Sequence, residues 1–234
     1  MSFVHAKESR FAFGSAALAA YLTSISTSTT TDTADSTDLT STTKNYVPGL
    51  SDSSITCAGL FEPLYDTPAV AAFGAANGSP VSVAPAGFAV GNPVLVLSGR
   101  ETTYELSGAV GAVVAANVTI QGDGRFDAGI SLADLAEVTA GANGSAHTAA
   151  AGTSNGGVAT LHVTAVTGTL TVKLQHSTNN STWSDLATFT AATAATSERI
   201  TVATGTTVNR YLRASWTLTG AGAAATFTTS FARR

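Results

Sequence analysis

Residues 42–63, TTKNYVPGLSDSSITCAGLFEP, carry the clearest structural pattern in the sequence. Within them, residues 53–61 alternate between two faces, with Ile55 and Cys57 on the apolar one, which predicts a β-strand with one buried face. The Tyr-Val-Pro-Gly-Leu run at 46–50 precedes this strand, and we interpret it as a rigid turn. The pattern therefore predicts that this segment joins a flexible arm to the edge of a β domain.

The predicted arm is the run at residues 26–43, STSTTTDTADSTDLTSTT. Leu39 is its single large apolar residue, so the segment cannot offset its ordering entropy by burying its own surface. We predict a long solvated loop that orders only against another copy of the chain. Asp32, Asp35 and Asp38 recur every three residues, but the glycine and the terminal glutamate of a calcium loop are missing, which argues against a metal site.

The composition favours a protein whose surface is covered by its own copies. Of 234 residues only 11% are charged, well below the roughly one quarter that is typical of soluble domains. Residues 1–145 contain 5 Lys/Arg and 13 Asp/Glu, a net charge of −8, whereas residues 146–234 carry +4. An acidic first half does not attract nucleic acid by counterion release, so DNA would pass it without being held.

The chain shows no sign of export or membrane insertion. Its first residues lack the basic and apolar regions of a secretory signal, and no run reaches the roughly 18 apolar residues of a membrane span. Cys57 is the only cysteine, which excludes an intramolecular disulfide, and we interpret it as a small buried hydrophobe. We therefore expect folding in a cytosol, with no membrane partner.

The strand pattern predicts an all-β chain with two units. Residues 1–145 are expected to form a β-sandwich or barrel with one packing helix at residues 66–77, where Asp66 is a suitable N-cap. Residues 146–157 have the Gly- and Ala-rich composition of a linker, and residues 158–234 are expected to form a small second β-sandwich. Further strands of the first unit are predicted at residues 81–84, 94–98, 102–106, 109–116, 118–121 and 125–132.

In the second unit, strict alternation on both sides of Thr167-Gly168 predicts a β-hairpin with its turn at these residues. The expected aromatic core consists of Trp183, Phe189, Trp216 and Phe227. The final Arg233-Arg234 is interpreted as a solvated tail.

No arrangement of residues points to catalysis, to a metal or to a cofactor. The four histidines are scattered, and no pair of them has metal-ligand spacing. Residues 152–156 match the G-x-S-x-G pattern of hydrolases, but that motif needs a strand before it and a helix after it, and here a linker and a strand flank it. We predict a structural protein rather than an enzyme.

Several motifs resemble those of the major tail tube proteins of long-tailed bacteriophages. In the first half they are AYLTSIS at 20–26, TADST at 33–37, KNYVPGLSD at 44–52 and GLF at 59–61. In the second half, residues 174–183, 209–214 and 231–234 resemble a β module that follows in some of these proteins.

The resemblance implies a β-sandwich protomer that forms hexameric rings, in which the inner sheets join into a closed barrel and the rings stack into a tube. The implied partners are copies of the chain, other tail proteins, and DNA that passes through the lumen without specific binding. The implied location is the virion tail, assembled in the host cytoplasm, with the long loop reaching a neighbouring protomer or ring.

The arm and the turn after it are the predicted assembly site. Its residues are Asp32, Asp35, Asp38, Leu39, Lys44, Tyr46, Pro48, Gly49, Leu50 and Asp52. Pro48 and Gly49 are expected to set the angle between the arm and the domain. Two alternatives remain open: a carbohydrate- or surface-binding module, in which Tyr211 and Trp183 would stack on sugars, and a capsid decoration protein.

Overall fold

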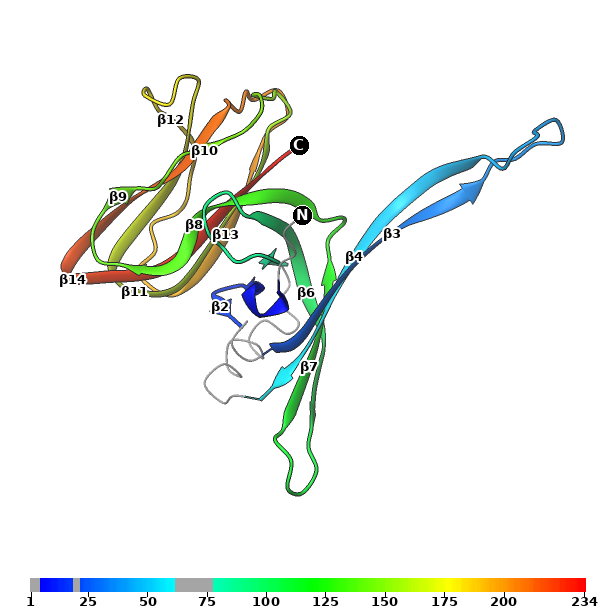
Figure 1. Cartoon of the computed structure of the whole chain (residues 1–234), viewed down its shortest axis with the longest axis horizontal. Coiled ribbons are helices and arrows are strands. Elements are labelled where there is room, and N and C mark those ends of the chain that lie inside the picture. The colour runs from blue at the N-terminus through cyan, green and yellow to red at the C-terminus, as the bar shows by residue number, and fades with distance from the viewer. Residues whose placement is uncertain (1–4, 19–21, 62–77) are drawn as a thin grey trace.

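The computed structural model describes residues 5–18, 22–61 and 78–234, and nearly all of their regular structure is β (Figure 1). A 3-10 turn, η1 at Ala6–Glu8, is the one helical element among them. The strands are β1 (Arg10–Phe13), β2 (Ala16–Ala17), β3 (Leu22–Asp35), β4 (Tyr46–Leu60), β5 (Ser79–Ala84), β6 (Pro93–Ser107), β7 (Ala115–Gly122), β8 (Asp127–Val138), β9 (Ala142–Asn143), β10 (His147–Thr148), β11 (Gly157–Ser177), β12 (Ser184–Thr188), β13 (Thr196–Val202) and β14 (Tyr211–Arg233). The predicted packing helix at residues 66–77 lies outside the described residues.

Strand β4 confirms the predicted one-sided pattern. Ile55 and Cys57 are buried, with 0% and 2% exposure, whereas Thr56 between them is exposed. Both buried residues belong to a hydrophobic cluster that includes Phe11 and Val81. Burial raises the pKa of the Cys57 thiol to about 12, so this cysteine packs as a small hydrophobe.

The long loop predicted at residues 26–43 is wrong over most of its length. Residues up to Asp35 continue strand β3, which pairs with β4 from Leu22 opposite Gly59 to Asp35 opposite Tyr46. The predicted rigid turn that begins at Tyr46 is part of β4. Composition alone misjudged this segment because threonine favours extended backbone, and because the partner strand supplies the hydrogen bonds without any side-chain burial.

Two long strands, β11 and β14, form the centre of the second half. The hairpin turn predicted at Thr167-Gly168 is wrong, because β11 runs through this point and pairs with β14 over nearly its whole length. The two strands turn a corner together at the left of Figure 1. Gly168 permits the corner: its φ is +85°, and a Cβ there would lie 2.3 Å from the Thr219 carbonyl oxygen.

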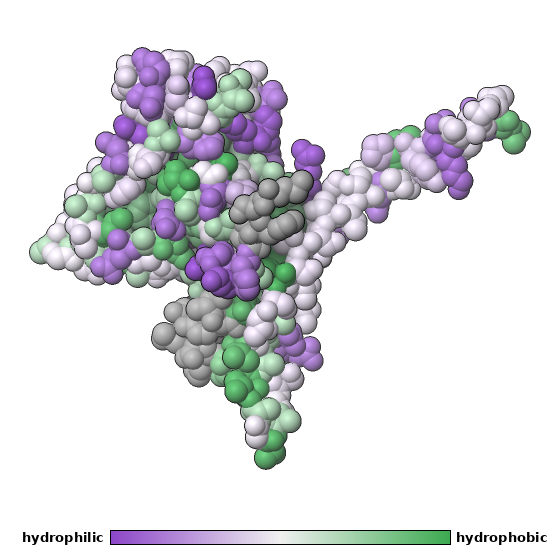
Figure 2. All heavy atoms as spheres, in the orientation of Figure 1, coloured by the Kyte–Doolittle hydropathy of each residue, from purple (hydrophilic) through white to green (hydrophobic). Residues whose placement is uncertain are grey.

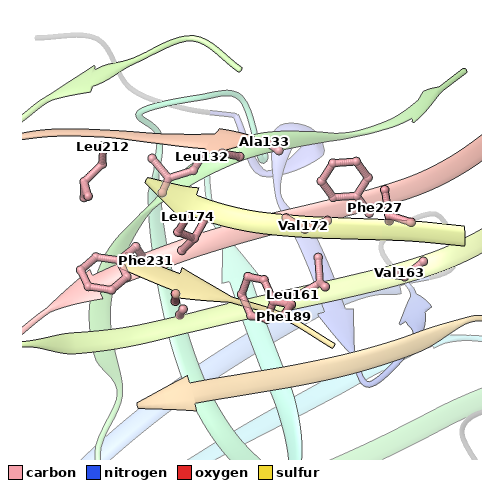
Figure 3. Close-up of a cluster of buried hydrophobic side chains, with 14 of the residues drawn as sticks. Leu132, Ala133, Leu161, Val163, Val172, Leu174, Phe189, Leu212, Phe227 and Phe231 are labelled. Carbon is pink, nitrogen blue, oxygen red and sulfur yellow. The ribbon is translucent and has the colours of Figure 1, made fainter. Parts of the chain in front are cut away.

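The corner lets both halves of β11 contribute to one core (Figure 3). Leu161 and Val163 come from the first half and Val172 and Leu174 from the second, and all four are at most 1% exposed within a single cluster. A turn would have produced two adjacent strands of one sheet. The corner instead closes the sheet over its own buried face.

Two of the four predicted core aromatics, Phe189 and Phe227, are buried in this cluster. Trp216 is only half-buried and meets the Phe227 ring edge to face, with 5.4 Å between ring centroids. The prediction for Trp183 is wrong, because its ring lies outside the cluster under the Arg213 guanidinium group, 4.2 Å from the ring centroid.

The two halves of the described chain share one sheet, so the predicted second small domain is not present as a separate unit. Strand β8 of the first half pairs with β14 of the second, and Val94 of β6 shares a buried cluster with Val158 and Ala232. The segment predicted as a linker runs beside β14, with His147 opposite Leu212. The domain boundaries remain a prediction that truncation would test.

The C-terminal arginines do not form the predicted solvated tail. Arg234 donates two hydrogen bonds to the Asp127 carboxylate, at 3.0 and 2.9 Å, and Arg199 donates a third at 3.0 Å. Arg233 donates to the Val208 carbonyl oxygen at 2.9 Å. The bonds to Asp127 tie Arg234, next to the end of β14, and Arg199 of β13 to the start of β8. They also give this carboxylate, which is only 8% exposed, the cationic partners that a buried charge needs.

Candidate assembly surface

The feature that sets this molecule apart from a closed β-sandwich is a four-stranded antiparallel sheet in the order β6–β7–β4–β3. Strand β6 enters this sheet with its second half, because β5 and β8 pair only with its first half, up to Gly99 and Val96. Among the described strands, β3 pairs with β4 alone, and β6 beyond Gly99 pairs with β7 alone. The sheet therefore extends from the body of the molecule with β3 and β6 as its two edges.

The two faces of this sheet differ in chemistry. The face with Ile55, Cys57 and Ile120 packs on the core. By strand alternation, the opposite face carries mainly small polar side chains: Ser24, Ser26, Ser28, Ser54, Thr56, Thr103, Asn117, Thr119 and Gln121. Its charged residues are Arg100 and Glu105 on the β6 edge, together with Asp52 at the base of the arm, which accepts a hydrogen bond from Gln121. This face is therefore nearly neutral, although the first half of the chain is acidic.

Beyond Ser54, the last β4 residue that pairs with β7 in this direction, β3 and β4 continue as a two-stranded arm that projects from the body (Figure 1). We call residues 29–53 the arm. The hydroxyl oxygens of Thr29 and Ser53 lie 2.9 Å apart, as do those of Thr31 and Ser51. A two-stranded hairpin is at best marginally stable alone in water, so the arm gains stability if another surface covers it.

Acidic residues hold the turn at the end of the arm. Asp38 accepts hydrogen bonds from the Thr40 hydroxyl at 2.7 Å and from its N–H at 2.8 Å, and these bonds lower the pKa of Asp38. Asp35 is bonded by Thr37 in the same way, which lowers its pKa, and it lies 3.9 Å from the Lys44 ammonium group. These carboxylates are occupied with turn formation, and the described residues contain no cluster of three metal-ligating side chains.

Pro48, Gly49 and Leu50 form a β-bulge rather than the predicted turn. Gly49 and Leu50 of β4 both lie opposite Asp32 of β3, which interrupts the ladder between Thr31 and Thr33. A Cβ on Gly49 would lie 3.3 Å from the Asp32 Cβ, so the two backbones approach closely there. Bulges bend a strand and increase its twist, and the predicted influence of Pro48 and Gly49 on the direction of the arm remains a prediction.

All ten predicted assembly residues lie on the arm, but at three separate places. Asp35, Asp38, Leu39, Lys44 and Tyr46 lie at its end, Asp32, Pro48, Gly49 and Leu50 at the bulge, and Asp52 at the base, where the Gln121 side-chain amide donates to its carboxylate. Leu39 and Leu50 are 107% and 82% exposed. Their role in assembly remains a prediction.

A second projection was not anticipated from the sequence. Residues 109–116 are predicted as a strand, whereas residues 108–114 form the loop that joins β6 to β7 at the end of the sheet opposite the arm. Gly108 and Gly111, with φ of +87° at Gly111, are the sequence signal that marks this loop. Val110, Val113 and Val114 have high β-propensity and lie between other strand-forming residues, so the sequence pattern predicts a strand where the structure has this loop.

One ionisable group on the core face of the sheet is out of place. Glu101 lies opposite Ile120 and is 3% exposed. Neither of its carboxylate oxygens has a hydrogen-bond partner within the described chain. Burial raises the pKa of Glu101 to about 7, because a low-dielectric surrounding disfavours the charged form.

A buried serine–histidine pair has a structural role. His162 Nε2 lies 2.8 Å from Ser82 Oγ, and its Nδ1 lies 2.8 Å from the Gly14 carbonyl oxygen. The carbonyl can only accept, so Nδ1 carries the proton and Ser82 donates to Nε2. Burial lowers the pKa of His162 to about 4, and both side chains are at most 1% exposed, so no substrate reaches them. The pair ties β5 to β11.

The aromatic pair considered for sugar stacking is covered on one side by arginines. The Arg213 guanidinium group lies over Trp183, and that of Arg210 lies 5.5 Å from the centroid of the Tyr211 ring. Cation–π contact of this kind competes with a stacked sugar ring. The arrangement weighs against a carbohydrate-binding module.

Within the described residues, no helix has the length and apolar character needed to cross a membrane.

No family model matches the sequence, and neither does any curated protein. Several solved structures are similar to this chain at low sequence identity, and three of them are described here. A chain of the virion of a native gene transfer agent particle is 18% identical over 52% of this chain and 95% of its own, with a TM-score of 0.44. A chain of the sheath–tube complex of PVC, an extracellular contractile injection system, is 15% identical over 54% of this chain and 90% of its own, with a TM-score of 0.43. The SPP1 Dit protein, a hub of the adsorption apparatus in phages that infect Gram-positive bacteria, is 8% identical over 97% of this chain and 99% of its own, with a TM-score of 0.39.

Proposed function

We propose that this chain is a structural subunit of a virion tail tube, without enzymatic activity, and that the β6–β7–β4–β3 sheet is its ring-forming element. The observation that carries the proposal is the pair of sheet edges formed by β3 and β6. Unpaired strand edges are templates for pairing with another chain. Joining such sheets edge to edge into a closed barrel removes the edges altogether.

Strand direction favours this closure. The four strands alternate in direction, so β3 runs opposite to β6. In a ring related by rotation, β3 of one copy would meet β6 of the next copy antiparallel. The ladder between copies would then be antiparallel, like the ladders within each copy. In a sheet of three or five alternating strands the two edge strands run in the same direction, so copies would meet in a parallel ladder instead.

The proposed ring has room for DNA. Six copies, the number implied by the sequence resemblance, would supply about 24 strands, which at ~4.8 Å spacing and ~40° tilt close into a barrel about 50 Å across at the backbone. The core face of the sheet is already covered by the body, so the hydroxyl-rich face would line the lumen. This face offers few cations to phosphate groups, so DNA would slide past it.

The proposal defines the partners and the location of the protein. Its main partners are copies of itself, within and between rings, followed by other tail proteins and by DNA in the lumen. It would function in the virion tail after assembly in the host cytoplasm.

Electron microscopy of the purified protein tests the proposal. Rings or tubes are expected, and a protein that stays monomeric at every concentration and salt condition would contradict it. Protein that instead binds isolated capsids would favour the decoration-protein alternative.

Proline substitutions on β3 test the edge itself. Neighbouring residues of a strand direct their N–H groups to opposite edges. One of the two variants Ser26→Pro and Thr27→Pro therefore removes a hydrogen bond to β4, and the other removes an N–H donor from the outer edge of β3. The variant that retains the urea midpoint of the wild type identifies the outward position. That variant should form no rings. Normal rings from it would show that closure does not use the β3 edge.

A further inference from the structure

Glu101 is a buried carboxyl group on one of the two strands that the proposed ring would join. Among the described strands, β6 beyond Gly99 pairs with β7 alone, and Glu101 lies two residues further along. The β6–β7 ladder is irregular directly after it, between Glu101 and Thr103. The residue is only 3% exposed, and neither carboxylate oxygen has a hydrogen-bond partner within the described chain. An uncompensated charge is costly in such surroundings, so the neutral carboxyl group fits this place better than the ionised one.

The described surroundings of Glu101 in its own copy provide no cation. Ile120 lies directly opposite, and the residues of β1 and β5 that pack on this face of the sheet are apolar. The other ionisable side chains of β4, β6 and β7 on the same face are Cys57 and Tyr104, and neither is a cation. Arg100 is next to Glu101 in the sequence but, by strand alternation, lies on the opposite face.

The strand that would cover the β6 edge in a ring brings no cation either. Strand β3 contains no Lys, Arg or His, and its two charged side chains are Asp32 and Asp35. The far end of β6 is uncharged as well, since residues 106–118 contain no charged side chain, and this end of the molecule is green in Figure 2. An ionised Glu101 would therefore meet backbone groups, hydroxyl groups and further carboxylates, but no countercharge on β3.

Two cations of the next copy would lie beside β3, but at a different level. Lys7 and Arg10 line a groove next to residues 22–25. The paired rows of the sheet place Ile25 level with Tyr104, whereas Thr27, Ile55 and Ile120 lead to Glu101. A cation that nevertheless reached Glu101 would reverse the expected pH dependence, so the experiment below distinguishes the two cases by sign.

We propose that ring closure requires a protonated Glu101, so that this carboxyl group makes assembly depend on pH; the inference rests on the proposed tube function and concerns the regulation of the same β6 edge. In a free copy, the outer side of β6 has no partner strand among the described residues, so an ionised Glu101 reaches water by a small movement of the irregular ladder. Strand β3 of the next copy would cover that side. The closed ring would then keep water from the carboxyl group and favour its neutral form.

The sign of the pH dependence follows from the proton bound in the two states. Burial raises the pKa of Glu101 to about 7 in the folded monomer, and further burial in a ring would raise it more. Below pH 7 both states hold the proton, so this group leaves assembly unchanged. Above pH 7 each contact has to take up a proton, and its association constant should fall by up to about tenfold per pH unit. Burial lowers the pKa values of His147, His162 and His176, so these groups titrate below this window.

Sedimentation and electron microscopy of the full chain at about pH 6.5, 7.5 and 8.5, at constant ionic strength, test the proposal. The concentration at which half of the wild-type chains are in rings should rise by about tenfold between the two higher values. Glu101→Gln, whose side chain stays neutral, should form rings at the same concentration at all three. Glu137→Gln removes an exposed carboxyl group on β8, outside the ring-forming sheet, and should keep the pH dependence of the wild type. Circular dichroism at the highest pH should show that the wild-type monomer remains folded.

Several results would overturn the control by Glu101 and leave ring formation standing. They are a wild type whose threshold concentration does not change with pH, an equal rise in Glu101→Gln, and a loss of rings that coincides with unfolding. Rings that become more stable as the pH rises would also overturn it, because a cation such as Lys7 or Arg10 would then pair with the carboxylate. Absence of rings from the wild type at every pH would instead refute the proposed function together with this inference.

Discussion

Replacing Glu101 with glutamine should change how the stability of the monomer depends on pH. The pKa of this carboxyl group is 4.5 in its ordinary state and about 7 in the folded chain, because it is buried. Between these values the folded state holds a proton that the unfolded state has released. Its contribution to stability is therefore fully present below pH 4.5 and is lost as the pH rises to 7, at ~1.4 kcal/mol per pH unit or about 3 kcal/mol in all.

His162 acts in the opposite direction over nearly the same pH window. Its pKa falls from 6.5 to about 4 on burial, so below pH 6.5 the unfolded state binds a proton that the folded state does not. The contribution of neutral His162 is present above pH 6.5 and is lost as the pH falls to 4, again by about 3 kcal/mol. In the wild type the two groups nearly compensate between pH 4.5 and 6.5, and Glu101→Gln should expose the slope due to His162.

Urea unfolding of the monomeric fraction, followed by the fluorescence of Trp183 and Trp216, measures this effect. The stability difference between Glu101→Gln and the wild type should be near zero at pH 4.5 and should grow to about 3 kcal/mol in favour of the variant at pH 7.5. Glu105→Gln, at an exposed position of the same strand, is the control and should show no such growth. A difference for Glu101→Gln that stays constant across this range would refute the reasoning, because it would mean that the buried carboxyl group ionises normally.

Four further predictions concern the fold and the arm. Asp127→Asn should lower the free energy of unfolding by about 3 kcal/mol in urea titrations, because Arg199 and Arg234 lose their charged partner. Gly168→Ala should destabilise by more than about 2 kcal/mol in the same assay or prevent folding, whereas Gly205→Ala, also at positive φ but with no atom within 4 Å of the added Cβ, should cost only about 1 kcal/mol. Replacing residues 31–51 with Asn-Gly between Thr30 and Asp52, which lie opposite each other, should leave a folded monomer that forms rings but no tubes in electron micrographs. Removing residues 150–234 should yield insoluble protein in a solubility assay, because β8 loses its pairing with β14; a folded truncated chain would instead support the predicted domain boundary.

The sequence predicts those features whose stability is local to a strand. In residues 53–61 the burial of every second side chain is visible as alternation, and β4 follows it. The strands of the arm show no such alternation, because the pairing of Thr31 with Ser51 depends on backbone hydrogen bonds and exposed hydroxyl groups. Period-two patterns also cannot distinguish a tight turn from a corner. At Gly168 both need a positive φ, and only the distant partner strand β14 decides between them.

Of the candidate site, only the part with a local sequence pattern was predicted. The arm residues stood out because a long polar run is unusual in a compact domain, whereas Val110 and Val113 resembled ordinary strand residues and revealed their exposure only in three dimensions. Glu101 likewise has nothing in its neighbouring sequence that marks it as buried.

The composition of the arm suits the proposed assembly, in which contacts would have to be strong in a tube and weak between monomers. A long two-stranded arm rich in valine and isoleucine would aggregate through its edges before rings could form. Serine and threonine preserve extended backbone and edge hydrogen bonds while removing most of the apolar attraction, so a single arm contributes little binding energy by itself. In the proposed tube, a ring would present several arms at once, and once one arm was bound the others would bind at high effective concentration. Weak individual contacts at Leu39 and Leu50 would then sum to a stable junction between rings but not between monomers, which couples tube growth to prior ring closure.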